Sequence, residues 1–498
     1  MPFLPKSLPR ICVALGLPTA ALLANSAETE YKDGNNFLEF RLDYLKSPAS
    51  GIEALRAFKE KYPDSYLLAT CRHRQAAGHF DGDVQQQLRI LKDAARAGAT
   101  FIDLEIETAE QTKPELAALR ALAPLCLSYH NFESTPALSP VLKRLERIPA
   151  DLHKLAVTAR KPSDNLRLFD ALRVPHKVPL IAVAMSEVGL VSRVLSPCMG
   201  SLYSYAAPSC DRGTAPGQVP AKLLRGLYRC EKLTPHSRIY GVIASPVAHS
   251  KSPLIHNRAF QSRRIDAVYL PFLVPPPHLS DWMKVAAQLP VAGFSVTIPH
   301  KQRIMRYLDV IEPQAKRIGA VNTVWRKAGK WRGANTDTEG VIQPLSKHLR
   351  LANSSILIAG YGGAARAAAI ALSDASAKVS ITGRDLKSAQ QLADVVKGNA
   401  LTLTEAQSAH FDAFIQATPL GMLPDSDASI FEDKIPAAIV MDMVYNPHET
   451  KLLKLARAQN ATIIHGIDML LEQAAHQFEL WTGETAPRGV MQHALEMH

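Results

Sequence analysis

Two serine hydroxyls lie two residues apart near the middle of this 498-residue chain, just after an apolar stretch. Residues 239–244 have the composition of a buried strand, and Ser250 and Ser252 follow them after a turn that contains Pro246. Pro253 suits the first turn of a helix, where its missing N–H group costs nothing. Hydroxyls and free backbone N–H groups therefore meet between a strand and a helix, where they could hold an anion or a polyol. An ordinary capped helix would show the same local pattern.

A second set of reactive side chains alternates with apolar residues along four strand-like stretches in the first half of the chain. Helical sequences connect these stretches. In an open sheet the helices would cover the polar face, which a solvated face would not allow. We therefore favour the interior of a closed α/β barrel over the solvated face of an antiparallel sheet. The stretches are residues 37–44, 101–107, 125–130 and 152–157, and their polar side chains are Glu39, Arg41, Asp43, Asp103, Glu105, Glu107, Ser128, His130 and Lys154.

A lysine, a histidine and several carboxylates inside one barrel suit Schiff-base chemistry on a ketone. Burial of Lys154 in an apolar strand favours its neutral, nucleophilic amine. His130 could move a proton, and the carboxylates could orient the histidine or bind hydroxyl groups. This spacing does not name the substrate.

A glycine-rich turn in the second half predicts a dinucleotide-binding domain. An apolar strand leads into residues 360–365, which read Gly-Tyr-Gly-Gly-Ala-Ala and open an alanine-rich helix. Such glycines let the backbone approach a pyrophosphate at a helix N-terminus. The next strand ends in Thr382-Gly-Arg384, where an NAD enzyme would carry an acid. Arg384 suits a 2′-phosphate, so we expect NADP, although Asp385 follows directly.

Composition is typical of a globular protein, and the length suggests roughly three domains. The net charge of +11 comes without a Lys/Arg run or an aromatic–basic repeat, which favours acidic small molecules over nucleic acid. Six scattered cysteines form no Cys-x-x-Cys pair and no Cys/His cluster with zinc spacing, so we expect reduced thiols and no metal site.

The N-terminal apolar run resembles a secretory signal, but we interpret it as part of the barrel. It extends from Ile11 to Ala24, Pro18 interrupts it, and residues 11–15 are needed as the first strand. No other apolar stretch is long enough to span a bilayer. We therefore expect a cytoplasmic protein without a membrane partner.

The ordered motifs of the first half resemble the type I 3-dehydroquinate dehydratase family over about residues 8–230. In chain order they are Glu39-Phe-Arg41-Leu-Asp43, Thr70-Cys-Arg72, Asp103-Leu-Glu105, Ser128-Tyr-His130, Lys154, Ser192-Arg193 and Ala215-Pro-Gly-Gln218. The resemblance implies that Lys154 forms the imine and that His130 transfers the proton, with Glu105 as the carboxylate partner of His130. It also implies a substrate-binding set of Glu39, Arg41, Arg72, Arg193, Thr214 and Gln218, with Arg193 on the substrate carboxylate.

One motif departs from this family. After Thr-x-Arg the family commonly carries Glu-Gly-Gly, whereas this chain has Ala76 at the acid position and Ala77 at the first glycine. The resemblance therefore implies the same chemistry with an altered dehydratase rate.

The second half resembles the shikimate dehydrogenase family from about residue 237 to the end of the chain. The motifs include the Ser250/Ser252 stretch, Gly293 to Lys301, Ala-Val-Asn322, Asp337, the glycine turn and the run from Gly466 to Gln473. The resemblance implies a catalytic pair of Lys301 and Asp337, and substrate binding by Ser250, Ser252, Thr297, Asn322, Tyr445 and Gln473. It implies cofactor binding by Gly360, Gly362, Gly363, Ala364, Ala365, Thr382, Arg384, Thr418, Met422, Val444, Gly466 and Met469.

The sequence therefore predicts an N-terminal (β/α)8 barrel over residues 1–232. An α/β substrate domain (237–340) and an NADP-binding Rossmann domain (341–498) follow, with C-terminal helices that return to the substrate domain. The order resembles a bifunctional plant enzyme, which implies dehydration of 3-dehydroquinate and then NADPH-dependent reduction to shikimate. Two alternatives stay open: a preference for quinate, to be sought at Ser250, Thr297 and Tyr445, and a ligand-sensing regulator. The oligomeric state is not predicted.

Overall fold

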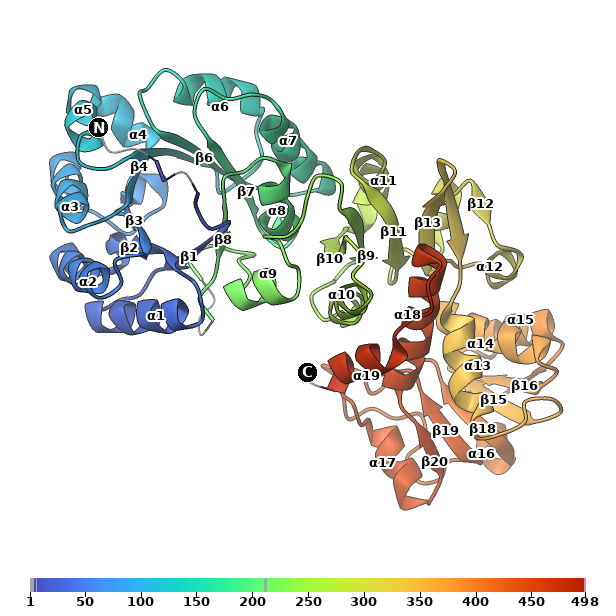
Figure 1. The fold of residues 1–498 in the computed structure, drawn as a ribbon. Helices are drawn as coiled ribbons and strands as arrows, with labels where there is room; N and C mark the ends of the chain where they lie inside the picture. The colour runs from blue at the N-terminus through green and yellow to red at the C-terminus, as the bar shows by residue number, and fades with distance from the viewer. Residues whose placement is uncertain (1–3, 6, 210–212, 497–498) are drawn as a thin grey trace. The chain divides into compact units, whose positions relative to one another are not determined.

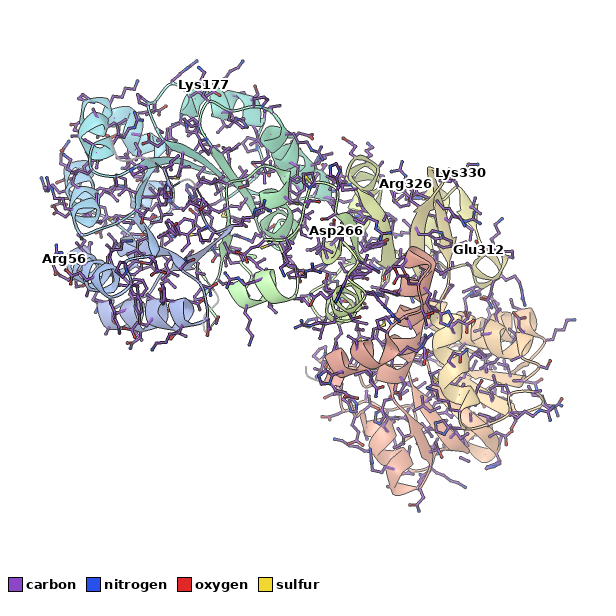
Figure 2. All side chains as sticks on the ribbon, in the orientation of Figure 1. Arg56, Lys177, Asp266, Glu312, Arg326 and Lys330 are labelled. Atoms are coloured by element: carbon purple, nitrogen blue, oxygen red, sulfur yellow. The ribbon has the colours of Figure 1, made fainter. Side chains whose placement is uncertain are left out.

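The computed structural model describes residues 4, 5, 7–209 and 213–496, which form two compact units (Figure 1). One unit contains the chain up to Arg238 together with Asp266–Pro290, and the other contains Ile239–Ile265 and the chain from Val291 onward. Exposed basic side chains such as Arg56, Lys177 and Lys330 contribute to the positive net charge (Figure 2). Within the described ranges, no helix combines the length and apolar composition needed to cross a membrane.

The first unit contains the predicted barrel, a parallel eight-stranded sheet in the order β7-β6-β5-β4-β3-β2-β1-β8. The two ends of this order meet where the Leu202 N–H donates to the Leu180 carbonyl oxygen. The strands are β1 (Ile11–Leu15), β2 (Phe37–Arg41), β3 (Tyr66–Thr70), β4 (Phe101–Glu105), β5 (Leu125–His130), β6 (Leu152–Thr158), β7 (Leu180–Met185) and β8 (Ser204–Ala206).

Helices surround the strands and cover their outward apolar side chains, so the polar face predicted from the alternation points inward (Figure 1). Beneath that polar layer, the interior is closed by apolar and aromatic side chains that include Phe37, Phe101, Leu152 and Tyr203. The helices are α1 (Ala20–Lys32), α2 (Pro48–Lys61), α3 (Val84–Arg96), α4 (Ile106–Gln111), α5 (Leu116–Arg120), α6 (Leu138–Leu145), α7 (Pro162–Arg173), α8 (Leu190–Leu195) and α9 (Ala221–Gly226).

Two strands are shorter than their alternation predicted. β2 ends at Arg41, so Asp43 lies in a 3-10 turn (Leu42–Tyr44), where it accepts two hydrogen bonds from the Arg41 guanidinium. β4 ends at Glu105, and Glu107 lies in helix α4 next to Arg144 instead of in the barrel. In both cases the chain turns away at the carboxyl end of the strand, which alternation alone does not reveal.

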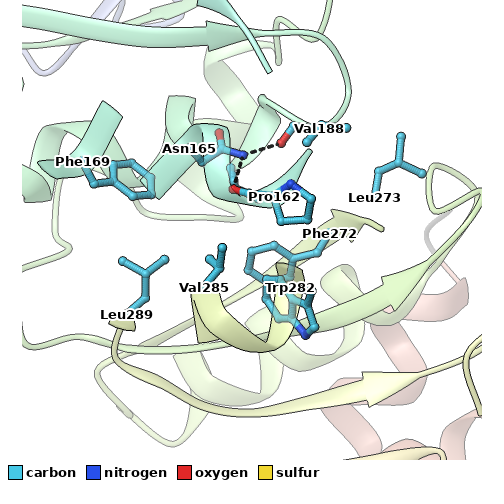
Figure 3. Close-up of a pocket in the computed structure, with 10 residues that line it drawn as sticks. Pro162, Asn165, Phe169, Val188, Phe272, Leu273, Trp282, Val285 and Leu289 are labelled. Atoms are coloured by element: carbon cyan, nitrogen blue, oxygen red, sulfur yellow. Dashed lines mark hydrogen bonds between the residues drawn. The ribbon is translucent and has the colours of Figure 1, made fainter. Parts of the chain in front are cut away.

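Strand β10 (Ala267–Leu273) and helix α11 (Leu279–Gln288) belong to the same compact unit as the barrel. Phe272 and the fully buried Trp282 line a small apolar cavity together with residues of α7 and α8 (Figure 3). The Asp281 carboxylate accepts a hydrogen bond from the Ser163 N–H at the start of α7 (2.8 Å). The contact satisfies one of the N–H groups that a helix leaves free in its first turn.

The second unit contains a mixed sheet that carries the predicted substrate residues. Its strands run in the order β9-β11-β13-β14-β12, with β11 parallel to β9 and antiparallel to β13. β11 ends at Val296, and Lys301 lies between it and a 3-10 helix (Arg303–Tyr307). The elements are β9 (Arg238–Ala244), α10 (Ser252–Ser262), β11 (Val291–Val296), β12 (Val310–Ile311), α12 (Pro313–Ile318), β13 (Thr323–Lys327), β14 (Lys330–Ala334) and α13 (Asp337–Ser346).

The remaining residues form a six-stranded parallel sheet in the order β17-β16-β15-β18-β19-β20. This is the doubly wound order of a Rossmann fold, in which ligands bind where the strand order reverses, here between β15 and β18. Its strands are β15 (Ser355–Ala359), β16 (Lys378–Thr382), β17 (Asn399–Leu401), β18 (Phe411–Gln416), β19 (Ala437–Asp442) and β20 (Thr462–Ile464).

Both faces of this sheet are buried, because alternate residues of each strand enter separate apolar clusters. Ile356 and Ile358 of β15 belong to one cluster, and Leu357 and Ala359 belong to the other. The helices of this part are α14 (Gly363–Asp374), α15 (Leu386–Val396), α16 (Leu403–Ser408), α17 (Lys451–Ala458), α18 (Gly466–Thr482) and α19 (Arg488–Glu496).

Helix α18 connects the two sheets of the second unit. Gln477 accepts a hydrogen bond from the Ser295 hydroxyl and donates to Thr323, while the Trp481 indole N–H donates to the Val324 carbonyl oxygen. The predicted division into residues 1–232, 237–340 and 341–498 stays a prediction.

Candidate active sites

A cavity opens inside the barrel at the carboxyl ends of its strands. Its walls contain both cationic and hydroxyl side chains, which suits a small, polar and anionic molecule. The predicted residues Glu39, Arg41, Arg72, His130, Lys154, Arg193, Thr214 and Gln218 all line it, together with Tyr44, Ala77, Phe132, Ala156, Val183, Met185, Tyr205 and Ala215.

The Lys154 amine is held by two carboxylates and an aromatic ring. Its Nζ lies 3.1 Å from Asp103 Oδ2 and 3.9 Å from Glu39 Oε1, and it lies 4.3 Å from the centre of the Tyr205 ring. Asp103 also accepts hydrogen bonds from Arg72 (2.7 Å) and from the Ser128 hydroxyl (2.8 Å). The amine therefore has a fixed position beside the cavity.

Asp103 is the anion at the centre of this network. Burial alone would raise the pKa of its carboxyl group, but the charges of Lys154 and Arg72 outweigh burial and hold that pKa well below its usual range. Asp103 lay on the predicted polar face, but its pairing with Lys154 was not predicted. Its position opposite the lysine depends on strand register.

His130 is in the form that a general base requires. Burial lowers the pKa of its imidazole well below its usual value, and the charges of Arg72 and Lys154 lower it further, so the ring is neutral at pH 7. The Phe132 ring stacks against His130, with ring centres 5.9 Å apart. Within the described part of the chain, Nδ1 of His130 is buried without a hydrogen-bond partner.

The predicted pairing of Glu105 with His130 has no hydrogen bond to support it among the described residues. Glu105 Oε1 instead accepts from the Gln87 amide (2.8 Å), the Thr108 hydroxyl (3.0 Å) and the His73 N–H (3.2 Å). Glu105 thus anchors the segment after β3, and the negative charge that acts on His130 comes from Asp103.

Arg193 is a fully buried cation for which the described residues provide no carboxylate partner. Its Nη2 donates to the Pro216 carbonyl oxygen (3.2 Å), and its Nε has no partner in the described structure. Burial lowers the pKa of its guanidinium to about 10. Arg41 and Arg72 are each paired with an aspartate, so Arg193 is the arginine of this cavity best placed to bind an anionic ligand.

Two backbone positions with positive φ shape the walls of the cavity. Ser186, at φ +79°, donates its N–H to the Pro216 carbonyl oxygen and its hydroxyl to the Ala159 carbonyl oxygen. It thereby holds the loop in which the Thr214 N–H donates to Gln218 Oε1 (2.7 Å). Ala77 lines the cavity at φ +55°, in the left-handed region that glycine adopts most easily. This conformation explains why the family that the barrel resembles commonly has a glycine at this position.

The second unit brings its predicted catalytic residues together. Lys301 Nζ lies 2.5 Å from Asp337 Oδ2, and the Asn322 amide donates to Asp337 Oδ1 (2.7 Å). The same amide lies 3.4 Å from Gln473 Oε1. These four side chains from separate elements therefore form one polar cluster, in which the lysine is about one-fifth exposed.

The remaining predicted substrate residues lie in the same unit, and the described part of the chain shows no direct hydrogen bond from them to this cluster. The Ser250 hydroxyl accepts from the Ser252 N–H (3.3 Å) at the start of α10, which leaves the Ser250 hydroxyl proton free to donate to a ligand. Thr297 is half-buried after β11, and Tyr445 is half-buried after β19, where burial raises the pKa of its phenol. The binding roles of these residues stay predictions.

The glycine turn has the open backbone that a pyrophosphate needs. A Cβ atom added to Gly362 would meet no atom within 4 Å, and Gly362 is the N-terminal cap of α14. Gly360, at φ +112°, lies close to Ala417 and Thr418 across the point where the strand order reverses. The turn also lies near Lys301, whose Cδ would be 3.9 Å from a Cβ on Gly363.

The end of β16 suits an adenosine phosphate. Arg384 is exposed, whereas the Asp385 carboxylate accepts from the Lys387 and Ser388 N–H groups and so caps α15. Asp385 is therefore not free to bind a ribose hydroxyl. The Thr382 hydroxyl is fully buried and has no partner within the described structure.

Other predicted cofactor residues occupy different environments. Met422 is exposed, Val444 is buried, and a Cβ on Gly466 would lie 2.5 Å from the Val444 carbonyl oxygen. Met469 packs in the apolar cluster of the Rossmann sheet. Its predicted contact with a nicotinamide stays a prediction, as do the roles of Ala364 and the buried Ala365.

Both halves of the chain match models of known families. Residues 11–235 match type I 3-dehydroquinase. Residues 242–324 match the shikimate dehydrogenase substrate binding domain, and residues 466–496 match the shikimate 5′-dehydrogenase C-terminal domain.

The chain is similar to the chloroplastic bifunctional 3-dehydroquinate dehydratase/shikimate dehydrogenase of Arabidopsis thaliana. The two are 34% identical over 480 residues, which cover 91% of this chain and 79% of the relative. The shikimate dehydrogenase (NADP+) of Shouchella clausii is 39% identical over 53% of this chain and 99% of its own length. A crystal structure of a shikimate dehydrogenase in complex with NADP+ matches 53% of this chain and 96% of its own chain, with a TM-score of 0.51 and 37% identity.

Replacement of Asp103 by asparagine should destabilise the barrel by about 3 kcal/mol at pH 7, because Lys154 and Arg72 would lose their shared buried anion. The native pKa of Asp103 is depressed, so its stabilising effect is present above the unfolded-state pKa of about 4 and declines as the pH falls below it. The difference in the free energy of unfolding between wild type and Asp103→Asn, measured with urea, should therefore shrink between pH 5 and pH 3.

Asp93→Asn, at an exposed ion pair, is the control and should change stability by less than about 0.5 kcal/mol. An equal loss of stability at pH 5 and pH 3 would contradict this account.

Proposed function

Because the chain belongs to the bifunctional 3-dehydroquinate dehydratase/shikimate dehydrogenase family, we propose that its two polar sites catalyse these two reactions in sequence. The barrel is a type I dehydratase, and the second unit is an NADP-dependent oxidoreductase of the shikimate pathway. This identity favours the enzyme over the alternative of a ligand-sensing regulator. The residue roles below are our proposal.

In the barrel, Lys154 attacks the C3 ketone of 3-dehydroquinate, and water leaves as the imine forms. Arg193 binds the substrate carboxylate, which replaces its missing ion-pair partner. Its burial without an acid is the observation that best supports this assignment. Glu39, Arg41, Arg72, Thr214 and Gln218, which all line the cavity, hold the hydroxyl groups and the ring.

The neutral His130 takes the proton from C2 and returns it to the C1 hydroxyl, which leaves as water while the new double bond forms. Hydrolysis of the imine then releases 3-dehydroshikimate and restores the Lys154 amine. The protonated imine carries the same positive charge as the lysine ammonium. Asp103, 3.1 Å from the amine nitrogen, therefore stabilises the cationic intermediate without moving.

In the second unit, Lys301 donates a proton to the C3 oxygen of 3-dehydroshikimate, and Asp337 holds and tunes the ammonium group through their contact. Asn322 fixes Asp337, while Ser250, Ser252, Thr297, Tyr445 and Gln473 bind the carboxylate and ring hydroxyls. The reduced nicotinamide supplies the hydride when it is bound. The distance between Lys301 and the glycine turn supports this role, because proton and hydride must reach the same carbonyl group.

NADP is the cofactor, in line with the NADP+-dependent relatives. We propose that Gly360, Gly362, Gly363 and the start of α14 hold the pyrophosphate and that Arg384 binds the 2′-phosphate. The use of Asp385 as a helix cap supports this preference, since an acid free to bind the ribose would favour NAD.

We also propose that the protein works in the cytoplasm on the free acids 3-dehydroquinate, 3-dehydroshikimate and shikimate. The five cysteines of the described residues are free thiols, which suits a reducing compartment. Cys210 lies outside the described residues.

Purified protein given 3-dehydroquinate and NADPH, with no other enzyme, should consume NADPH stoichiometrically, as followed by absorbance. Lys154→Ala should abolish this consumption but leave reduction of added 3-dehydroshikimate intact, because only the imine-forming amine is lost. Lys301→Ala should still produce 3-dehydroshikimate while NADPH oxidation falls by at least about a hundredfold.

Each variant controls for the folding of the other. Borohydride added with 3-dehydroquinate should attach the substrate to Lys154, as identified by peptide mass spectrometry, and should leave Lys154→Ala unmodified. Loss of both activities in either variant would show that the two sites are not separate, contrary to the proposal.

Arg384→Ala should raise the KM for NADPH by about tenfold and leave the KM for NADH unchanged, because one charge-assisted contact to the 2′-phosphate is lost. Lys378→Ala is the matched control, since it removes an exposed basic residue at the opposite end of the same strand. Steady-state kinetics with both cofactors measures the change. Equal increases in KM for NADPH and NADH would refute a 2′-phosphate contact.

A further inference from the structure

The loop after β19 makes hydrogen bonds to a buried carboxylate that is not among the predicted site residues. Asp442 is the last residue of β19, and its side chain is inaccessible to solvent. Its Oδ1 accepts from the Val444 N–H (3.0 Å), and its Oδ2 accepts from the Thr450 hydroxyl (2.6 Å). One carboxylate thus connects both ends of the loop from residue 443 to 450.

This loop carries two residues of the proposed dehydrogenase site, Val444 and Tyr445. It packs against the start of α18, where a Cβ on Gly466 would lie 2.5 Å from the Val444 carbonyl oxygen and 2.9 Å from that of Asp442. Helix α18 in turn carries Gln473, which lies beside Asn322. A shift of Val444 would therefore change the positions of both cofactor-binding and substrate-binding residues.

Thr450 makes the connection sensitive to the charge on Asp442. The Thr450 hydroxyl accepts from the Leu453 N–H as the N-terminal cap of α17 while it donates to Asp442. A protonated Asp442 would turn two charge-assisted hydrogen bonds into neutral ones, which are roughly half as strong. The Thr450 proton would also lose its ionised acceptor.

The surroundings of Asp442 place the protonation of its carboxyl group close to physiological pH. Burial raises the pKa of the carboxyl group to about 6, and the hydrogen bonds from Thr450 and Val444 oppose the rise. His465 is the ionisable group whose charge acts on Asp442 in the described structure. His465 also stacks on His448, with ring centres 4.5 Å apart.

We propose that Asp442 is a positioning residue of the dehydrogenase: its ionised carboxylate holds residues 443–450 in the conformation that binds the dinucleotide, and its protonation loosens that loop. Because this role rests on the proposed dehydrogenase function, the test must distinguish a change in the order of the loop from a failure of that function. Asp442→Asn keeps an acceptor for the Val444 N–H and a polar contact to Thr450 but cannot ionise. It should behave at every pH like the protonated wild type.

The first measurement is amide hydrogen exchange of residues 443–450 in the full-length protein without cofactor, corrected for intrinsic rates. Protection in the wild type should fall by about fivefold between pH 7.5 and pH 5, which is the expected difference between charged and neutral hydrogen bonds. Protection in Asp442→Asn should be low and constant. His465→Gln should still lose protection as the pH falls, with its midpoint moved upward because the charge of His465 lowers the pKa of Asp442; a profile that no longer depends on pH would identify the imidazole as the titrating group and overturn the proposal.

The second measurement is the Kd for NADP+ by calorimetry at the same pH values. The 2′-phosphate of NADP+ itself titrates near pH 6, so the informative quantity is the ratio of Kd between Asp442→Asn and wild type. This ratio should be about five at pH 7.5 and approach one at pH 5. Asp374→Asn, at an exposed ion pair on α14, should give a ratio near one throughout.

Equal protection and equal affinity of Asp442→Asn and wild type at pH 7.5 would overturn the proposal. So would a ratio of Kd that does not change with pH. If the wild type bound no NADP+, the proposed dehydrogenase function would fail, whereas the exchange profiles would still decide whether Asp442 restrains the loop.

Discussion

A buried ion pair, Lys154 with Asp103, is the constraint that organises the barrel. An ammonium group inside a barrel is costly unless an anion lies close to it, and Asp103 comes from a strand two places away in the sheet. Ser128, on the strand between them, is in register with Lys154 and donates its hydroxyl to the same carboxylate. Asp103 also receives Arg72, and Glu39 adds a second carboxylate beside the lysine, so the cations on this side of the cavity have anionic partners.

Arg193 is the exception. Arg41 and Arg72 are paired with aspartates, whereas the described residues give the Arg193 guanidinium no carboxylate, so it is the group that we propose binds the substrate carboxylate. The second unit treats its lysine differently, because Lys301 is partly exposed and is paired with Asp337 alone. This difference suits the proposed roles, because an enclosed nucleophile retains its covalent intermediate, whereas a partly exposed proton donor can be reprotonated from solvent.

Alternation of polar and apolar residues was enough to predict which face of four barrel strands points inward, and the glycine turn was enough to predict the dinucleotide domain. Both signals depend only on the local period of the chain. Pairs across strands were harder, because they depend on register and on where each strand ends. Glu107 was placed in a strand but lies in a helix, and Asp103 was not assigned to Lys154. Asp385, read as a weak argument for NAD, is used as a helix cap, which only the backbone reveals.

His130 shows how the departure at Ala76 affects the mechanism. The acid that the resemblance places there is missing from the chain, Glu105 is engaged elsewhere, and Nδ1 of His130 has no partner in the described residues. Arg72 and Lys154 already disfavour a positive charge on the ring, so in the proposed mechanism the imidazolium formed by C2 deprotonation would be poorly stabilised. The energetic cost would then fall on removal of the C2 proton, while return of that proton to the leaving hydroxyl would become more favourable. We therefore propose that this site keeps the Schiff-base chemistry and that proton abstraction is its slow step.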